Sequence, residues 1–290
     1  MLKKVLKWTG IVLGCVLLLL GCFYGYIYFN TESRLNKVYE VTAKPVIITN
    51  DSASIARGKH LAQIRGCAGC HMPDFAGGYA LADESTPIGV LYGPNITSGK
   101  GGISYTDADW IKALRHGIGK DNKPLWFMPS EEFYLLSNQD IGDIISYAKS
   151  RPPVDKEWPK KELKPLGRVL THFGEFPLIP AEKIDHNASF ADSVQKGITP
   201  EYGKYLALTC TGCHAPTFKG GPPHGPGQPE IPDISATGHL GKWSEPQFAA
   251  TMRTGKTPEG KALSDAMPWK MFTYSDDELK AVYSYLHDLK

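Results

Sequence analysis

Residues 67–71 read CAGCH, and residues 210–214 repeat the pattern as CTGCH. Two thiols two residues apart can each add to one vinyl group of a porphyrin, and the histidine that follows then lies beneath the iron. The spacing therefore predicts two covalently bound c-type haems, with iron porphyrin as the cofactor. The residues expected to bind it are Cys67, Cys70, Cys210 and Cys213 as thioethers and His71 and His214 as iron ligands.

Two other interpretations of the paired cysteines are a zinc site and local disulfides. Zinc ribbons place their two Cys-x-x-Cys units about 15–20 residues apart, whereas 140 residues separate Cys70 from Cys210. Two local disulfides would leave both following histidines unexplained. Haem attachment is the interpretation that uses all six residues.

The apolar run from Trp8 to Phe29 is long enough to cross a bilayer as a helix. Three lysines precede it, so the positive-inside rule puts the N-terminus in the cytoplasm and the haem domains outside, in a periplasm or its equivalent. A cleaved signal peptide is one alternative. The stretch LLGC at 19–22 also resembles a lipoprotein box, which leaves lipidation of Cys22 open.

Net charge is only +2, and the three lysines before the apolar run account for that excess. The remaining chain has no basic surplus, so nucleic acid is excluded as a partner class.

Short elements recur in the same order around each haem motif, which predicts two tandem domains built alike. The final helix of each unit is expected from apolar residues at helical spacing, and four helix starts carry an N-cap residue with an acid or amide three positions later. We expect an all-α fold and find no convincing strand pattern. The matched elements are GKHLA at 58–62 with GKYLA at 203–207, PNI at 94–96 with PDI at 232–234, and Tyr147 with Tyr285; the caps are Thr106, Ser137, Ser244 and Ser275.

The predicted organisation has five parts. A transmembrane anchor at 1–30 is followed by a polar stalk at 31–50, a first domain at 51–154, a proline-containing linker at 155–198 and a second domain at 199–290.

Met128 and Met267 each precede a proline at matching positions of the two units. A thioether sulfur opposite the histidine favours ferrous iron and raises the reduction potential. Both methionines are therefore predicted as axial ligands, although a methionine in an apolar loop can also simply fill the core. Met271 and His116 are the rival ligands that we considered.

Four further residues are assigned to the haem surroundings. A carbonyl at Pro94 or Pro232 could accept the proximal histidine N–H; a plain turn proline is the alternative. Arg115 and Arg253 end the middle helices, where a guanidinium could pair with a haem propionate or could be a solvated cation at a helix C-terminus.

Both units resemble class I c-type cytochrome domains, and the first is similar to cytochrome subunits of bacterial membrane-bound alcohol and sugar dehydrogenases. This resemblance implies an all-α fold around haem, His/Met ligation and electron transfer without substrate chemistry. Those subunits usually carry three haems, whereas this chain has two motifs. The residues that carry the resemblance are 67–71, 76–78, 94–97, 102–103, 105–107, 113–115, 128–129, 136–137 and 152–154.

The sequence thus predicts a membrane-anchored dihaem cytochrome that transfers single electrons and is not itself an enzyme. The expected partners are redox proteins: a dehydrogenase, a quinol-oxidising complex or a terminal oxidase. Two alternatives remain open: a dedicated subunit of a dehydrogenase or cbb-type oxidase, and a dihaem peroxidase with an acid/base group above an open iron site.

Overall fold

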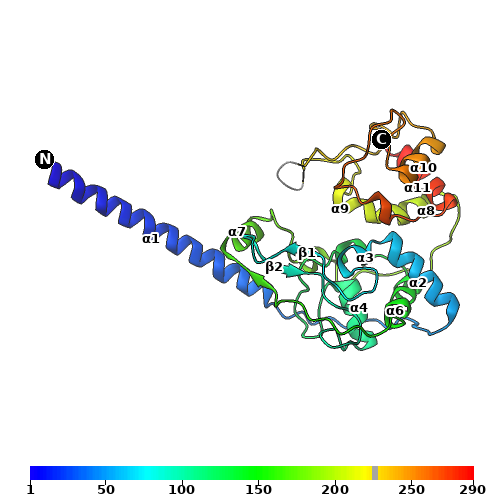
Figure 1. Cartoon of the computed structure of the whole chain (residues 1–290), viewed down its shortest axis with the longest axis horizontal. Coiled ribbons are helices and arrows are strands. Elements are labelled where there is room, and N and C mark those ends of the chain that lie inside the picture. The colour runs from blue at the N-terminus through cyan, green and yellow to red at the C-terminus, as the bar shows by residue number, and fades with distance from the viewer. Residues whose placement is uncertain (224–227) are drawn as a thin grey trace.

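A computed structural model describes residues 1–223 and 228–290. One long helix, α1 (Leu2–Leu35), projects from a globular part that holds two helical units side by side (Figure 1). Among the described residues α1 is the single helix long and apolar enough to cross a membrane, and it is a candidate anchor. It extends beyond the predicted run at both ends, and its last turns are buried at Ile27, Thr31 and Leu35.

The stalk predicted at 31–50 is not a free spacer. Residues 31–35 belong to α1, and the irregular segment that follows lies across α6 (Asn138–Lys149). The Thr49 N–H donates to Ser146 Oγ at 3.1 Å, and a side chain on Gly142 would come within 3.2 Å of the Ile47 carbonyl carbon. The segment is polar in composition, but its backbone is held against the first unit.

The two units have the same order of helices, as the internal repeat predicted. The first contains α2 (Ser52–Ile64), α3 (Cys67–His71), α4 (Asp107–His116), α5 (Ser130–Phe133) and α6. The second contains α8 (Pro200–Ala207), η2 (Leu208–Cys210), α9 (Thr211–His214), α10 (Glu245–Thr254), η3 (Trp269–Met271) and α11 (Asp276–Asp288).

The first and last helices of each unit cross at a glycine. A Cβ on Gly58 would lie 2.5 Å from the Asp143 carbonyl carbon and 2.9 Å from Tyr147 Cβ. A Cβ on Gly203 would meet Ala281 and Tyr285 at the same two distances. Because no side chain intervenes, the helix backbones touch, and the crossing of α2 on α6 is repeated by α8 on α11.

The predicted helix starts are confirmed. Thr106 and Ser275 form capping boxes with Asp109 and Glu278, which satisfies N–H groups that a helix start leaves without partners. The Asp140 N–H donates to Ser137 Oγ at 3.1 Å. In the fourth start, the Ser244 N–H donates to Gln247 Oε1 at 2.8 Å.

The prediction of a mostly helical fold is confirmed, and three short strands that no sequence pattern indicated are added to it. Three short strands, β1 (Ala80–Ala82), β2 (Gly89–Tyr92) and β3 (Glu162–Leu163), form an antiparallel sheet in that order. Strands of two to four residues are too short to show a period-two pattern. β3 comes from the linker, so pairing across about 70 residues creates the sheet.

The linker between the units also contains α7 (Pro165–Phe173) and η1 (Pro180–Lys183). It covers the first unit: Trp158 stacks on Tyr92 with ring centroids 5.3 Å apart, and its Nε1 donates to the Ala76 carbonyl at 2.8 Å. The proline-containing segment is therefore an ordered layer on the first domain.

Candidate haem sites

The first haem motif forms the short helix α3, which begins after Gly66 in the left-handed region (φ 71°). His71 at its end is 7% exposed, and its Nδ1 lies 3.0 Å from the Pro94 carbonyl oxygen. Burial lowers the pKa of this imidazole, while the hydrogen bond to Pro94 opposes the shift. A neutral ring that donates from Nδ1 leaves Nε2 as the free lone pair for a metal.

The second motif repeats this geometry. His214 is 5% exposed, its Nδ1 is 3.0 Å from the Pro232 carbonyl oxygen, and burial again lowers its pKa. The residue after each histidine, Met72 or Ala215, has a positive φ of 61° or 60°. The chain therefore turns away from each histidine in the same left-handed step.

A glycine packs directly against each of these proline carbonyls, where a larger side chain would not fit. A Cβ on Gly77 would lie 2.5 Å from the Pro94 carbonyl carbon, and one on Gly220 would lie 2.6 Å from Pro232 O. Both glycines also have positive φ, 76° and 70°. Each proline carbonyl is thus within hydrogen-bond distance of the histidine that is predicted to bind iron.

The four motif cysteines are free thiols, and no disulfide joins them. Burial raises the pKa of Cys67 and of Cys210 to about 12. Within the part of the chain that the structure describes, no three His, Cys, Asp or Glu side chains gather as a metal cage. The donor set is suited to haem c: reduced thiols for thioether bonds and a neutral buried imidazole.

The Met-Pro loops also repeat. Met128 and Met267 are both half-buried against the core. The Ser130 N–H donates to the Met128 carbonyl at 2.7 Å, and the Trp269 N–H donates to the Met267 carbonyl at 2.8 Å. Each Met-Pro loop therefore makes the same backbone turn, in which the N–H two residues later donates to the methionine carbonyl.

A family model described as cytochrome c matches residues 55–152 and 200–290, each segment containing one of the two motifs. The chain belongs to the cytochrome c family. Membership implies covalently bound haem c, and the cytochrome is an electron carrier.

Curated relatives are cytochrome subunits of dehydrogenases, as the resemblance predicted. The cytochrome is 29% identical to the fructose dehydrogenase cytochrome subunit of Gluconobacter japonicus over 86% of this chain and 56% of the relative. It is 30% identical to the cytochrome c subunit of the quinone alcohol dehydrogenase of Gluconobacter oxydans, over 82% and 55%. It is 26% identical to the gluconate 2-dehydrogenase cytochrome c subunit of Pantoea cypripedii, over 82% and 60%. The chain spans little more than half the length of these relatives.

The two arginines predicted near propionates have different environments in the cytochrome. Arg115 is 1% exposed and donates to the carbonyls of Tyr134 and Leu136 at 2.6 and 2.5 Å, so it is not a solvated cation. Burial lowers its pKa to about 10. Arg253 is 40% exposed and pairs with Asp276 at 2.9 Å. A shared propionate role stays a prediction.

The rival ligands are engaged elsewhere. His116 is buried, and its Nδ1 lies 3.1 Å from His186 Nδ1. The terminal methyl of Met271 lies 2.6 Å from where a Cβ on Gly69 would be, so this side chain packs against the haem motif of the other unit.

This last contact is half of a pseudo-symmetric pair. Met271 and Glu132 stand four residues after Met267 and Met128, and each packs on the middle glycine of the opposite haem motif. The Glu132 carboxyl carbon is 3.0 Å from the position of a Gly212 Cβ. Burial raises the pKa of Glu132 to about 7. Each attachment helix, α3 or α9, therefore contacts a residue of the other unit across the domain interface.

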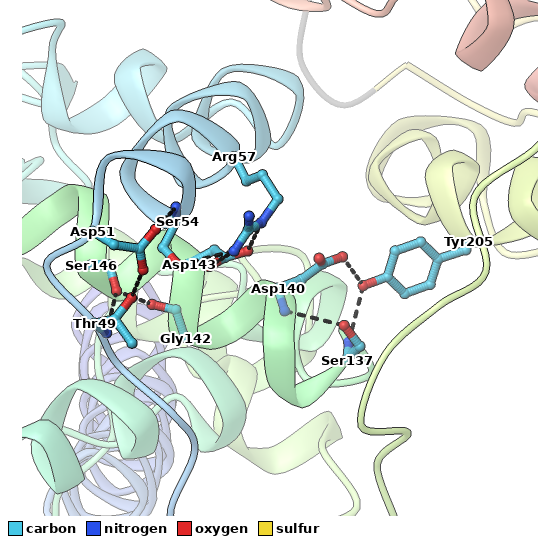
Figure 2. A network of polar contacts seen from close by, with 10 residues as sticks. All are labelled: Thr49, Asp51, Ser54, Arg57, Ser137, Asp140, Gly142, Asp143, Ser146 and Tyr205. Carbon is cyan, nitrogen blue, oxygen red and sulfur yellow. Dashed lines mark hydrogen bonds and ion pairs between the residues drawn. The ribbon is translucent and has the colours of Figure 1, made fainter.

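The polar contacts at this interface follow the same pseudo-symmetry. Tyr205 and His60 occupy matched positions on α8 and α2, and each reaches the N3 acid of the last helix of the other unit. Tyr205 Oη donates to Asp140 at 2.5 Å (Figure 2), and His60 Nε2 lies 2.8 Å from Glu278. The repeat in the sequence thus becomes an approximate two-fold relation in space.

Arg65 makes an interface contact that has no counterpart at its matched position. Arg65 is 3% exposed and donates to the carbonyls of Tyr205 and Leu206 and to Thr209 Oγ1, at 2.8–3.1 Å. Its matched position in the second unit is Leu208. A guanidinium of the first domain therefore binds the segment that leads into the second haem motif.

Sequence reasoning missed these interface residues. When the two repeats are aligned, Arg65 is matched by Leu208 and Glu132 by Met271. In both pairs a charged residue of the first unit is matched by an uncharged one in the second, and this difference could have indicated an asymmetric contact.

Proposed function

We propose that this cytochrome is a membrane-anchored dihaem electron carrier that works on the outer side of a cytoplasmic membrane. The observation that carries the proposal is the duplicated site. Each attachment motif combines a buried histidine, a proline carbonyl 3.0 Å from its Nδ1 and a Met-Pro loop of the same conformation.

Two haems fit the residues present. Cys67 and Cys70, and likewise Cys210 and Cys213, would form the thioether bonds, and His71 and His214 would bind iron. Haem iron supplies the one-electron chemistry when bound. The protein orients each imidazole through its Nδ1 hydrogen bond, excludes water by burial and offers Met128 and Met267 as the opposite ligands.

The pseudo-symmetric interface supports electron exchange between the two sites. Because Met271 packs on the first motif and Glu132 on the second, each attachment helix contacts the other unit directly. Arg65 fixes this arrangement from the first domain. We infer that the chain works as one two-centre carrier rather than as two independent domains.

We propose a membrane dehydrogenase as the electron donor, because the relatives' names place them in alcohol, fructose and gluconate dehydrogenases. Mild detergent extraction of the native membrane, followed by identification of co-purifying chains, tests this assignment. A membrane dehydrogenase is the expected partner. Recovery with a terminal oxidase instead would refute the donor assignment and leave the carrier role intact.

Ligation is tested separately with Met128→Ala and Met267→Ala. Each variant should lower the reduction potential of one haem and let carbon monoxide bind one ferrous iron, because the thioether ligand is lost. Met271→Ala is the matched control, since the structure packs that side chain on the other domain. If Met271→Ala opens an iron and Met267→Ala does not, the second axial assignment is wrong.

A further inference from the structure

Helix α7 of the linker has an apolar stripe that the protein leaves partly uncovered. Leu166, Val169, Leu170 and Phe173 follow the i, i+3, i+4, i+7 spacing of one helix face. Leu166 is 42% exposed and Phe173 is 59% exposed, and the other two residues of the stripe, Val169 and Leu170, are half-buried. An apolar helix face of this kind normally covers a core, but this one faces outward.

The opposite face of α7 is already occupied. A Cβ on Gly167 would lie 2.6 Å from Leu163 Cδ1 and 3.0 Å from the Ile88 carbonyl carbon. Thr171, one turn later on the same face, is 1% exposed. Since α7 packs on Ile88 and on Leu163 of β3 through this glycine, it cannot rotate to bury the stripe in its own domain.

The flank of α7 binds the last turns of α1. Arg168 pairs with Glu32 at 2.9 Å, and His172 Nδ1 lies 2.9 Å from Asn30 Oδ1. Arg34 donates from Nη1 to the Thr171 carbonyl at 3.2 Å. Figure 1 shows α7 at the edge of the globular part from which α1 projects.

This contact lies at the level where a membrane span would end. A bilayer core of about 30 Å takes about 20 helical residues, so a span that begins at Trp8 ends near Ile27. Ile27 is 2% exposed because the globular part covers it, and the Tyr26 ring is 5.5 Å from the His172 ring. Phe29, still 73% exposed, extends the exposed apolar surface of α1 to this level.

We propose that α7 lies in the outer membrane interface, with Leu166 and Phe173 inserted between lipid headgroups and acyl chains. A lipid surface is the occupant because α7 contacts α1 at the level where the exposed apolar surface of the anchor ends, and its own apolar stripe is exposed there. The Arg168 guanidinium lies over the Tyr28 ring at 4.2 Å, which gives a cation and an aromatic ring at the boundary, as membrane interfaces favour. With α1 and α7 both held, the first domain has one fixed orientation on the membrane.

The inference rests on the proposed membrane span of α1, so its test must distinguish the two. The full-length holoprotein is reconstituted in vesicles of phosphatidylcholine and phosphatidylglycerol. Photoreactive p-benzoylphenylalanine replaces Leu166, Phe173, Leu18 or Ile198, one position at a time. Leu18 reports the span itself. Ile198, 52% exposed, is the matched exposed control. It lies two residues before α8, a helix on the far side of the globular part from the N-terminal end of α1 (Figure 1).

Lipid adducts at positions 166 and 173, several-fold above the yield at position 198, are expected. Adducts at position 18 with only the control yield at 166 and 173 would overturn the inference and keep the span. Absence of lipid adducts at position 18 would refute the span, and the interfacial placement of α7 with it.

Discussion

Gly58→Ala tests whether the backbone contact between α2 and α6 holds the first domain together. The added Cβ would lie 2.5 Å from the Asp143 carbonyl carbon and 2.9 Å from Tyr147 Cβ. Carbon atoms normally touch at about 3.5–4.0 Å, so the helices must separate by roughly 1 Å. Both nearest groups are fixed to helix α6, and neither can rotate out of the way.

Two effects of opposite sign then compete. Overpacking of this kind costs about 3 kcal/mol at the upper end of its usual range. Replacing glycine by alanine inside a helix returns about 1 kcal/mol of intrinsic propensity. We therefore expect Gly58→Ala to lower the free energy of unfolding by about 2 kcal/mol.

Guanidinium titrations of the holoprotein, followed by far-ultraviolet circular dichroism and by the Soret band, measure this change. Gly203→Ala should cost the same in the second domain, because its added Cβ meets Ala281 and Tyr285 at the same distances. Gly197→Ala is the matched control: its nearest atom is Thr199 Cγ2 at 3.6 Å, and it should be nearly neutral. A Gly58→Ala protein as stable as wild type, or more stable, would show that propensity outweighs the contact and would refute the reasoning.

Two further predictions concern the domain interface and are measured by denaturant titration. Arg65→Met removes three hydrogen bonds to the second domain and should lower the free energy of unfolding by about 3 kcal/mol. The two domains should then unfold in two transitions instead of one. A single unchanged transition would contradict the role of Arg65 in holding the domains together. Burial disfavours ionisation of Glu278, but hydrogen bonds from His60 and Ser275 prevail and lower its pKa from 4.5 to about 2. A depressed folded-state pKa gives stability that is complete above the unfolded-state pKa and is lost as pH falls from about 4.5 to about 2. Glu278→Gln should therefore lose roughly 2–3 kcal/mol at pH 7 and show a flatter acid limb between pH 5 and 3; an acid limb as steep as wild type would mean that other carboxyls control it.

The sequence predicted most of what repeats. The paired glycines, the helix caps and the apolar faces of α6 and α11 are local signals, and they form the same contacts in both units. Ile141, Ile145 and Leu279 are each fully buried, as their helical spacing indicated.

What the sequence did not predict depends on contacts between distant segments. Arg65 resembles any surface cation until Tyr205 and Leu206 lie beside it, 140 residues later in the chain. The β2–β3 pair and the layer around Trp158 likewise arise only when the linker folds back on the first domain. The repeat could have indicated a pseudo-symmetric interface, because matched positions of the two units meet there.

The number of covalently bound haems tests the central claim most directly. Intact-protein mass spectrometry of the purified full-length chain, combined with a pyridine haemochrome assay, counts them. The account predicts two haems per chain, falling to one in Cys67→Ala/Cys70→Ala and to one in Cys210→Ala/Cys213→Ala. A wild-type chain with one haem, with none, or with pigment that acid–acetone removes would contradict it.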